Sequence, residues 1–234
     1  MLEVNEIHTY YGESHILQGL SLQVKEGEVV AILGPNGMGK TTTLRSIMGL
    51  TPPRSGTILF KQEDITHLRP FQIARKGIGY VPEDRGIFIS LTVLQNLRIP
   101  YLNKRERGEW SADLDRVFTL FPQLRERSKM MAGNLSGGEA QMLATARGLI
   151  AGHQVLFMDE PTEGLAPKIV QILLKTFKQL KEEKLTILLV EQNIKTAFEI
   201  ADRCYILEKG RIKVEDTISE IKKKPDVLHR YLGL

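Results

Sequence analysis

The chain has 234 residues, 42% of them hydrophobic and 26% charged, and its 32 Lys and Arg residues outnumber its 28 Asp and Glu residues by four. This length supports one large or two small domains with a real core, and the composition excludes disordered, collagen-like and coiled-coil chains. One cysteine, Cys204, excludes an internal disulfide, and with no signal segment at the start we expect a reducing compartment. The positive charge is spread along the chain and favours neither nucleic acid nor lipid, and no apolar run reaches the roughly 20 residues of a membrane helix.

The first part of the chain predicts half-buried strands. Residues 2–10 partly alternate between apolar and polar, Gly12 interrupts the pattern, and residues 16–24 alternate again before a turn at 25–27. Alternation of this kind is typical of antiparallel strands with one face on a core. We therefore expect an antiparallel flank.

Three later segments follow a different pattern. Residues 29–33, 155–158 and 186–190 are unbroken apolar runs, as expected of strands covered on both faces. Each is followed by apolar residues at helical spacing: Leu44, Ile47 and Met48; Ile169, Leu173, Phe177 and Leu180; Ala197, Phe198 and Ala201. Strand followed by helix, repeated, predicts an α/β fold with a parallel sheet.

The segment from about 86 to 152 has few strand signals and predicts an inserted helical subdomain. Its clearest helix carries the periodic set Met142, Leu143, Ala146, Leu149 and Ile150. The tail from Arg203 predicts a hairpin that turns at Gly210, then a small helix that Pro225 breaks. We expect the lysine run 222–224 to lie at an exposed helix end.

Residues 34–42, GPNGMGKTT, match G-x-x-x-x-G-K-[ST] and lie between the buried strand 29–33 and a helical period. Glycines let the backbone curl so that its N–H groups face phosphate oxygens, a lysine reaches the terminal phosphates, and a threonine hydroxyl is a hard ligand for Mg²⁺. We expect Thr41 to hold the metal and Thr42 to add a phosphate contact. The expected nucleotide-binding residues of this loop are Gly34, Pro35, Asn36, Gly37, Met38, Gly39, Lys40, Thr41 and Thr42.

Two carboxylates follow the buried strand 155–158. Asp159 is suited to Mg²⁺, and Glu160 to polarising the water that attacks a γ-phosphate. Such ligands bind at the carboxyl ends of parallel strands. The alternative is a pair of carboxylates that only favours the N-terminus of the next helix.

A second glycine turn, LSGGE at 135–139, precedes the helix of the inserted region. Ser136 and Glu139 are spaced as a capping box, which satisfies helix-end donors without a ligand. Gly137 and Gly138 nevertheless leave the helix N-terminus open to an anion. Capping and phosphate binding are therefore compatible.

GPNGMGKT, LSGGE and VLFMDEP, in this order, resemble the nucleotide-binding subunit of ABC transporters over essentially the whole chain. The resemblance implies ATP and Mg²⁺ as ligands, and a phosphate-loop NTPase core with an antiparallel flank and an inserted helical subdomain. It places the A-loop, phosphate loop and Q-loop in residues 1–85, the helical subdomain with the signature motif in 86–152, and the Walker B motif, switch and tail in 153–234.

The resemblance also implies a head-to-tail, ATP-dependent dimer. In such a dimer Ser136, Gly137 and Gly138 of one subunit close over the ATP held by the phosphate loop of the other. The second subunit is either another copy of this chain or a homologous ATPase. Tyr11, which precedes Gly12, is expected to stack on adenine, although the neighbouring Tyr10 and a purely structural role both stay open.

Three positions depart from the common ABC pattern. Glu83 replaces the Q-loop glutamine, Gln192 replaces the switch histidine, and Ala166 replaces an aspartate. Gln192, assigned here to the catalytic set with Glu160, can donate a hydrogen bond to the γ-phosphate but cannot hold a proton. Glu83 would reach the metal through water, and Ala166 can make no acid contact across a dimer.

The strings VPEDR, EGLAP and VEQN, with YLG at 231–233, resemble the ATPase subunits of branched-chain amino-acid importers. We expect an ATPase peripheral to the cytoplasmic side of a membrane, bound to separate permease subunits, served indirectly by an extracytoplasmic solute-binding protein, and without a nucleic-acid partner. Residues Phe88, Leu91, Val93 and Leu97 are candidates for the permease-facing surface, at least half of them expected to be core.

Other functions stay open. Urea-type importers are close relatives of this subfamily, and other ABC transporters share its motifs. A soluble ABC-type ATPase acting on nucleic acid or ribosomes would need the same ATP site. Finally, the replacement of the switch histidine by Gln192 allows a nucleotide-dependent assembly switch without turnover.

Overall fold

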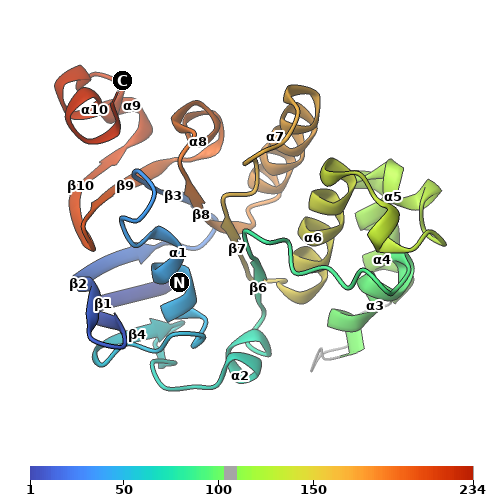
Figure 1. Cartoon of the computed structure of the whole chain (residues 1–234), viewed down its shortest axis with the longest axis horizontal. Coiled ribbons are helices and arrows are strands. Elements are labelled where there is room, and N and C mark those ends of the chain that lie inside the picture. The colour runs from blue at the N-terminus through green and yellow to red at the C-terminus, as the bar shows by residue number, and fades with distance from the viewer. Residues whose placement is uncertain (103–109, 234) are drawn as a thin grey trace.

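The computed structural model describes residues 1–102 and 110–233 and contains two sheets (Figure 1). The smaller, four-stranded sheet has the order β2-β1-β4-β5, with strands Ser14–Val24, Leu2–Tyr11, Ser55–Phe60 and Glu63–Asp64. The larger, six-stranded sheet has the order β10-β9-β3-β8-β7-β6, with strands Arg211–Thr217, Arg203–Glu208, Val29–Leu33, Thr186–Glu191, Val155–Asp159 and Ile78–Val81. The small sheet is antiparallel and β3, β6, β7, β8 and β9 pair in parallel, so the predicted α/β fold and antiparallel flank are confirmed.

Helices connect the strands of the two sheets and cover them. Their bounds are Lys40–Ile47 (α1), Pro70–Ala74 (α2), Val93–Leu102 (α3), Trp110–Leu120 (α4), Pro122–Glu126 (α5), Gly137–Ala151 (α6), Pro167–Glu182 (α7), Ile194–Ile200 (α8), Ile218–Ile221 (α9) and Pro225–Leu232 (α10), with a short 3₁₀ turn at Ala132–Asn134. Strands β4 and β5 and helix α2 were not predicted from the sequence. Within the described residues, no helix has the length and apolar content needed to cross a bilayer.

The larger sheet is buried on both faces, which explains its unbroken apolar strands. Along β3, Val29 and Ala31 belong to a core shared with α6, α7 and α8, whereas Val30 and Ile32 belong to a core shared with the small sheet and α1. Alternate residues of a strand point to opposite faces, so each face must be apolar. The sheet therefore forms a rigid base for the loops at its carboxyl edge.

The helices α3, α4 and α5 gather at one end of the molecule, and α6 lies between them and the sheet (Figure 1). The backbone of α6 approaches β6 closely, because Gly79 faces Gly148 and Gly152 without side chains between them. The periodic apolar set of α6 is buried, as predicted. The helical subdomain is thus present, and its boundaries at 85/86 and 152/153 stay predictions.

The candidate permease-facing residues divide between the core and the surface. Val93 and Leu97 are fully buried and so are core residues, while Phe88 keeps 45% of its surface exposed, in line with the expected division of the candidate surface. Pro225 does not simply break a helix. It occupies the first turn of the separate helix α10, a position where the missing N–H costs nothing. The lysine run 222–224 is exposed, as expected.

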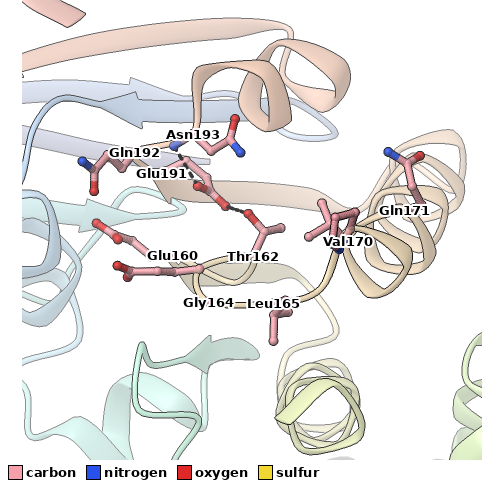
Figure 2. Close-up of a pocket in the computed structure, with 11 residues that line it drawn as sticks. Glu160, Thr162, Gly164, Leu165, Val170, Gln171, Glu191, Gln192 and Asn193 are labelled. Carbon is pink, nitrogen blue, oxygen red and sulfur yellow. Dashed lines mark hydrogen bonds between the residues drawn. The ribbon is translucent and has the colours of Figure 1, made fainter. Parts of the chain in front are cut away.

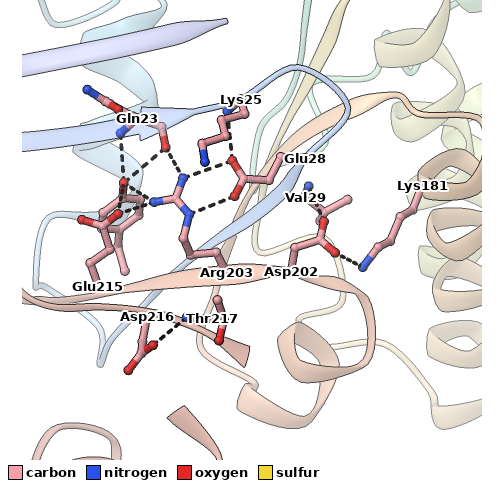
Figure 3. Close-up of polar contacts among 11 residues, drawn as sticks. Gln23, Lys25, Glu28, Val29, Lys181, Asp202, Arg203, Glu215, Asp216 and Thr217 are labelled. Carbon is pink, nitrogen blue, oxygen red and sulfur yellow. Dashed lines mark hydrogen bonds and ion pairs between the residues drawn. The ribbon is translucent and has the colours of Figure 1, made fainter. Parts of the chain in front are cut away.

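A polar network at the amino end of β9 joins this strand to β2 and to the turn after β2 (Figure 3). Arg203 donates to both carboxylate oxygens of Glu28, to Glu215 and to the backbone oxygen of Gln23. Beside it, Asp202 accepts from the backbone N–H of Val29 and pairs with a lysine of α7. The hydrogen bonds from Arg203 lower the pKa of Glu28 although burial acts in the opposite direction.

Candidate functional site

The site forms where three neighbouring strands end. Strands β3, β8 and β7 lie side by side in the larger sheet and run in the same direction. Their carboxyl ends therefore bring the loop 34–39, the segment 191–193 and the segment 159–163 to one edge. Ligands bind at this edge in open α/β sheets.

The loop 34–39 has the backbone of a phosphate cradle. Gly37 and Gly39 have φ values of 78° and 103°, in the left-handed region that favours glycine. Gly34 must lack a side chain because a Cβ there would lie 2.5 Å from the backbone oxygen of Leu207. In the described part of the chain, no hydrogen bond uses the N–H of Gly37, Met38 or Gly39 as donor. Three consecutive free N–H groups are suited to an anion.

Lys40 opens α1 and points back over this loop. Its Nζ lies 3.1 Å from the backbone oxygen of Pro35, 3.4 Å from Oδ1 of Asn36 and 3.0 Å from Oε1 of Glu160. The side chains of Lys40 and Glu160 are 3% and 6% exposed. The structure thus brings together the cation and the carboxylate that the sequence placed in different roles.

Asp159 and Thr41 form the predicted metal pair. Thr41 Oγ1 donates to Asp159 Oδ1 at 3.0 Å, and the Tyr80 hydroxyl donates to Oδ2 at 3.3 Å. Burial raises the pKa of Asp159 to about 6, and the nearby carboxylates of Glu83 and Glu160 act in the same direction, whereas these hydrogen bonds lower it. The buried carboxylate of Asp159 and the hydroxyl of Thr41 are both hard oxygen donors, and burial makes a cation beside this carboxylate favourable. These residues therefore fit Mg²⁺, which typically takes one or two carboxylates, phosphate oxygens and waters.

Glu160 follows β7 in a strained backbone conformation. Its φ is 46°, a value that non-glycine residues adopt only where the surrounding structure holds them. Its N–H donates to the backbone oxygen of Val190 at 2.9 Å. Glu163 lies beside it, and a hydrogen bond shared with Glu160 raises the pKa of Glu163. Strain of this kind is typical of functional residues.

The segment after β7 and the segment after β8 both line a cavity of about 490 Å³. Glu160 and Gln192 extend the same way from neighbouring strand ends (Figure 2). Between them, Glu191 is only 2% exposed and accepts hydrogen bonds from Thr162 and from the N–H of Asn193. Burial raises the pKa of Glu191 to about 7. The predicted Gln192 thus lines the same cavity as Glu160.

The structure distinguishes the two candidate adenine-stacking tyrosines. The ring of Tyr10 stacks on His15 with centroids 4.2 Å apart, and the guanidinium of Arg54 lies 4.2 Å from the centroid of the same ring. Tyr11 is 45% exposed and makes one long hydrogen bond, from Thr51 at 3.4 Å. Tyr11 therefore has the ring surface available to a base.

The signature turn lies apart from these residues. Ser136 caps α6 through the predicted capping box: Glu139 N–H donates to Ser136 Oγ at 3.3 Å, and Ser136 N–H donates to the Glu139 carboxylate at 2.9 Å. Gly138 packs against Ile169, where a Cβ would lie within 2.8 Å of the side chain. Ser136, Gly137 and Gly138 do not line the cavity beside Glu160. Helices α1 and α6, which follow the phosphate loop and this turn, lie on either side of β7 in one chain (Figure 1).

Two further positions need comment. Glu83 is exposed, and its charge reaches Asp159, whereas Ala166 is an exposed N-cap of α7 without a side-chain cap. The sequence pattern did not predict a role for Tyr80 or Glu163, or the contact between Thr162 and Glu191. The only sequence feature that pointed to this contact is the acidic residue Glu191, which directly follows an apolar strand.

The profile of the ABC transporter family matches residues 17–163 of this chain. The chain belongs to the ABC transporter ATPases. It is therefore an ATPase that binds ATP and ADP and whose hydrolysis of ATP powers transport, and ABC cassettes dimerise and work with membrane components of transporters.

The chain is similar over its full length to curated members of this family. It is 41% identical to the high-affinity branched-chain amino acid transport ATP-binding protein BraG of Pseudomonas aeruginosa, covering 100% of both chains. It is 40% identical to the probable branched-chain amino acid transport ATP-binding protein LivF of Archaeoglobus fulgidus, covering 94% of both. Identity to the lipopolysaccharide export system ATP-binding protein LptB of Escherichia coli is 32%, over 95% of this chain and 93% of LptB.

Solved structures give the same family. The ADP conformation of an ATP-binding cassette of an ABC transporter superposes with a TM-score of 0.83 at 27% identity, covering 100% of this chain and 99% of the other. A dimeric post-hydrolysis cassette bound to ADP and phosphate gives a TM-score of 0.83 at 26% identity, covering 93% and 99%. The predicted ABC ATPase fold is confirmed.

Proposed function

We propose that this ABC ATPase drives the import of branched-chain amino acids through separate permease subunits. The observation that carries the proposal is the 41% identity to BraG over the whole of both chains. Identity to LptB is lower, at 32%, which favours amino-acid import over lipopolysaccharide export. The protein would act on the cytoplasmic side of the membrane without entering it.

In this function the site residues divide into three tasks. The free N–H groups of residues 37–39 and the Nζ of Lys40 bind the β- and γ-phosphates of ATP. Thr41 and Asp159 hold Mg²⁺, which when bound neutralises charge on the phosphate oxygens. Tyr11, whose ring is exposed, stacks on adenine.

Glu160 orients and polarises the attacking water. The γ-phosphate competes with Glu160 for Lys40, so ATP binding frees the carboxylate to accept a proton from water. Gln192, across the cavity, donates an amide hydrogen bond to the γ-phosphate. Glu83, whose charge reaches Asp159, would contact a bound Mg²⁺ through water.

The second half of the site comes from another subunit. In one chain the N-terminus of α6 and the phosphate loop lie on opposite sides of β7 (Figure 1). Ser136 and this N-terminus would therefore face a phosphate that a partner holds. A head-to-tail dimer, with another copy or a homologous ATPase, brings the two halves together.

Uptake by whole cells tests the transport function. Cells lacking this protein are complemented with the wild type or with Glu160→Gln, and uptake of radiolabelled leucine, isoleucine, valine and urea is measured. The proposal predicts that only the wild type restores uptake, and only of the branched-chain amino acids. Restored uptake of urea alone, or no change in any uptake, contradicts it.

A further inference from the structure

The segment that carries Glu160 is tied to the end of β8 at two points. The N–H of Glu160 donates to the backbone oxygen of Val190, and Thr162 Oγ1 donates to Glu191 Oε1 at 2.8 Å. The first tie is a backbone bond that any residue could make. The second depends on the side chains at 162 and 191, which are 29 residues apart in the chain.

Glu191 also fixes the segment that carries Gln192. Its second carboxylate oxygen accepts from the N–H of Asn193 at 3.2 Å, and its backbone pairs with Leu33 at the end of β3. One carboxylate therefore joins the loop after β7 to the loop after β8 (Figure 2). It lies between Glu160 and Gln192, which we propose to act at the γ-phosphate (Figure 2).

Joining two loops through a buried carboxylate costs free energy, which suggests that the contact has a role beyond stability. Glu191 is 2% exposed, and burying a charged group in place of a neutral one is unfavourable. The contact has a consequence for Glu160, whose φ of 46° persists only if its neighbours on both sides are held. Without the Thr162 tie, the segment can relax and the Glu160 carboxylate moves.

We propose that Glu191 is a positioning residue for ATP hydrolysis: through Thr162 and Asn193 it holds Glu160 and Gln192 at their working separation. The proposal rests on the ATPase function proposed above and assigns Glu191 no direct contact with ATP. It predicts an effect on the chemical step and not on nucleotide binding, because the phosphate loop has its own anchors. It also predicts that a neutral side chain with the same hydrogen-bonding reach can replace Glu191.

The test compares steady-state ATPase kinetics of the full-length protein with Mg²⁺ and ATP. Glu191→Val and Thr162→Val should each lower kcat at least about tenfold and leave KM within about twofold, as misplacement of catalytic groups does. Glu191→Gln should retain nearly full activity, because its amide accepts from Asn193 N–H while Thr162 Oγ1 accepts from its NH₂ group. The double variant Thr162→Val, Glu191→Val should be no slower than the slower single variant.

Thr66→Val is the matched control, because Thr66 is a buried threonine that accepts a hydrogen bond from Ile58 N–H in the small sheet, away from the site. Equal losses of kcat in Thr66→Val and Thr162→Val would overturn the proposal, since stability alone would then explain both. Unchanged kcat in Thr162→Val and Glu191→Val, with hydrolysis abolished by Glu160→Gln, would overturn this inference alone. A wild-type protein without hydrolysis would overturn the proposed function as well.

Discussion

Lys40 Nζ lies 3.0 Å from Glu160 Oε1, and both side chains are almost entirely buried. The pair joins the first residue of α1 to the loop after β7, across β8. Each group neutralises the charge of the other. The same lysine is the cation that a γ-phosphate would attract, so we expect ATP to compete with Glu160 for it.

This pairing predicts a stability effect that a simple phosphate-binding lysine would not show. Lys40→Met leaves Glu160 buried without a cation and should lower the free energy of unfolding by about 3 kcal/mol without nucleotide. Urea denaturation of Lys40→Met and of Lys40→Met, Glu160→Gln measures the effect. The second variant should recover most of the loss, and an equally unstable double variant would show that the two side chains are not coupled.

The buried Glu191 predicts a pH dependence of stability. Its pKa is about 7 in the folded protein and 4.5 in an ordinary environment, so the folded state binds the extra proton between these pH values. Stability from this group is therefore lost as pH rises from 4.5 through 7, by up to about 3 kcal/mol. Glu191→Gln should gain stability relative to the wild type between pH 5 and pH 8. Urea denaturation without nucleotide measures the difference, and Glu13→Gln, which changes an exposed carboxylate, should show no such gain.

The environments of the two tyrosines predict different effects on ATP affinity. Tyr11→Ala should raise the Kd for ATP about tenfold, since stacking on a base contributes about 1–3 kcal/mol. Tyr10→Ala removes a ring that already stacks on His15 and should change the Kd by less than about twofold. Fluorescence titration with a labelled ATP analogue compares them. The opposite order of effects would assign adenine to Tyr10.

The network around Arg203 predicts a change in stability without a change in catalysis. Arg203 is 13% exposed and makes hydrogen bonds to two carboxylates and a backbone oxygen, all far from the phosphate loop. Arg203→Met should lower the free energy of unfolding by about 1–2 kcal/mol, because the half-buried carboxylate of Glu28 loses its donor while Glu215 and Gln23 stay exposed to water. The exposed pair Lys223 and Glu220 is the control, and Lys223→Ala should change it by less than about 0.5 kcal/mol. A loss of kcat in Arg203→Met at a temperature where it is folded would contradict this division.

The sequence predicted the parts of the site whose chemistry lies in contiguous residues. The phosphate loop and the pair Asp159 and Glu160 are short strings next to apolar strands, and parallel strands must end at the same edge, so their meeting followed from the strand pattern. The contact between Thr162 and Glu191 could not be predicted, because it depends on which strands are neighbours and on side-chain direction. Tyr80 was missed for the same reason, since its strand β6 pairs with β7 only in the fold.

Some helices and strands could be predicted from the sequence and others could not, for similar reasons. The apolar periods of α1, α6, α7 and α8 were strong enough to predict helices, while β4 and β5 lack such a pattern and gain their stability from pairing with β1 and each other. Val93 and Phe88 are both apolar and close in sequence, yet only Val93 faces the core. Hydrophobicity alone does not say whether a side chain faces the core or the solvent, so only the structure separates the core residues from the candidate permease-facing ones.

Glu160 is expected to act once ATP is bound, and one measurement tests this role directly. Purified Glu160→Gln is incubated with ATP and Mg²⁺, its hydrolysis rate is measured, and its mass is determined by sedimentation, with EDTA and ADP as controls. We expect ATP to bind, hydrolysis to fall at least about 100-fold as for loss of a general base, and a dimer to accumulate with ATP but not with ADP. An unchanged hydrolysis rate, or a variant that stays monomeric and fails to bind ATP, would contradict the central claim.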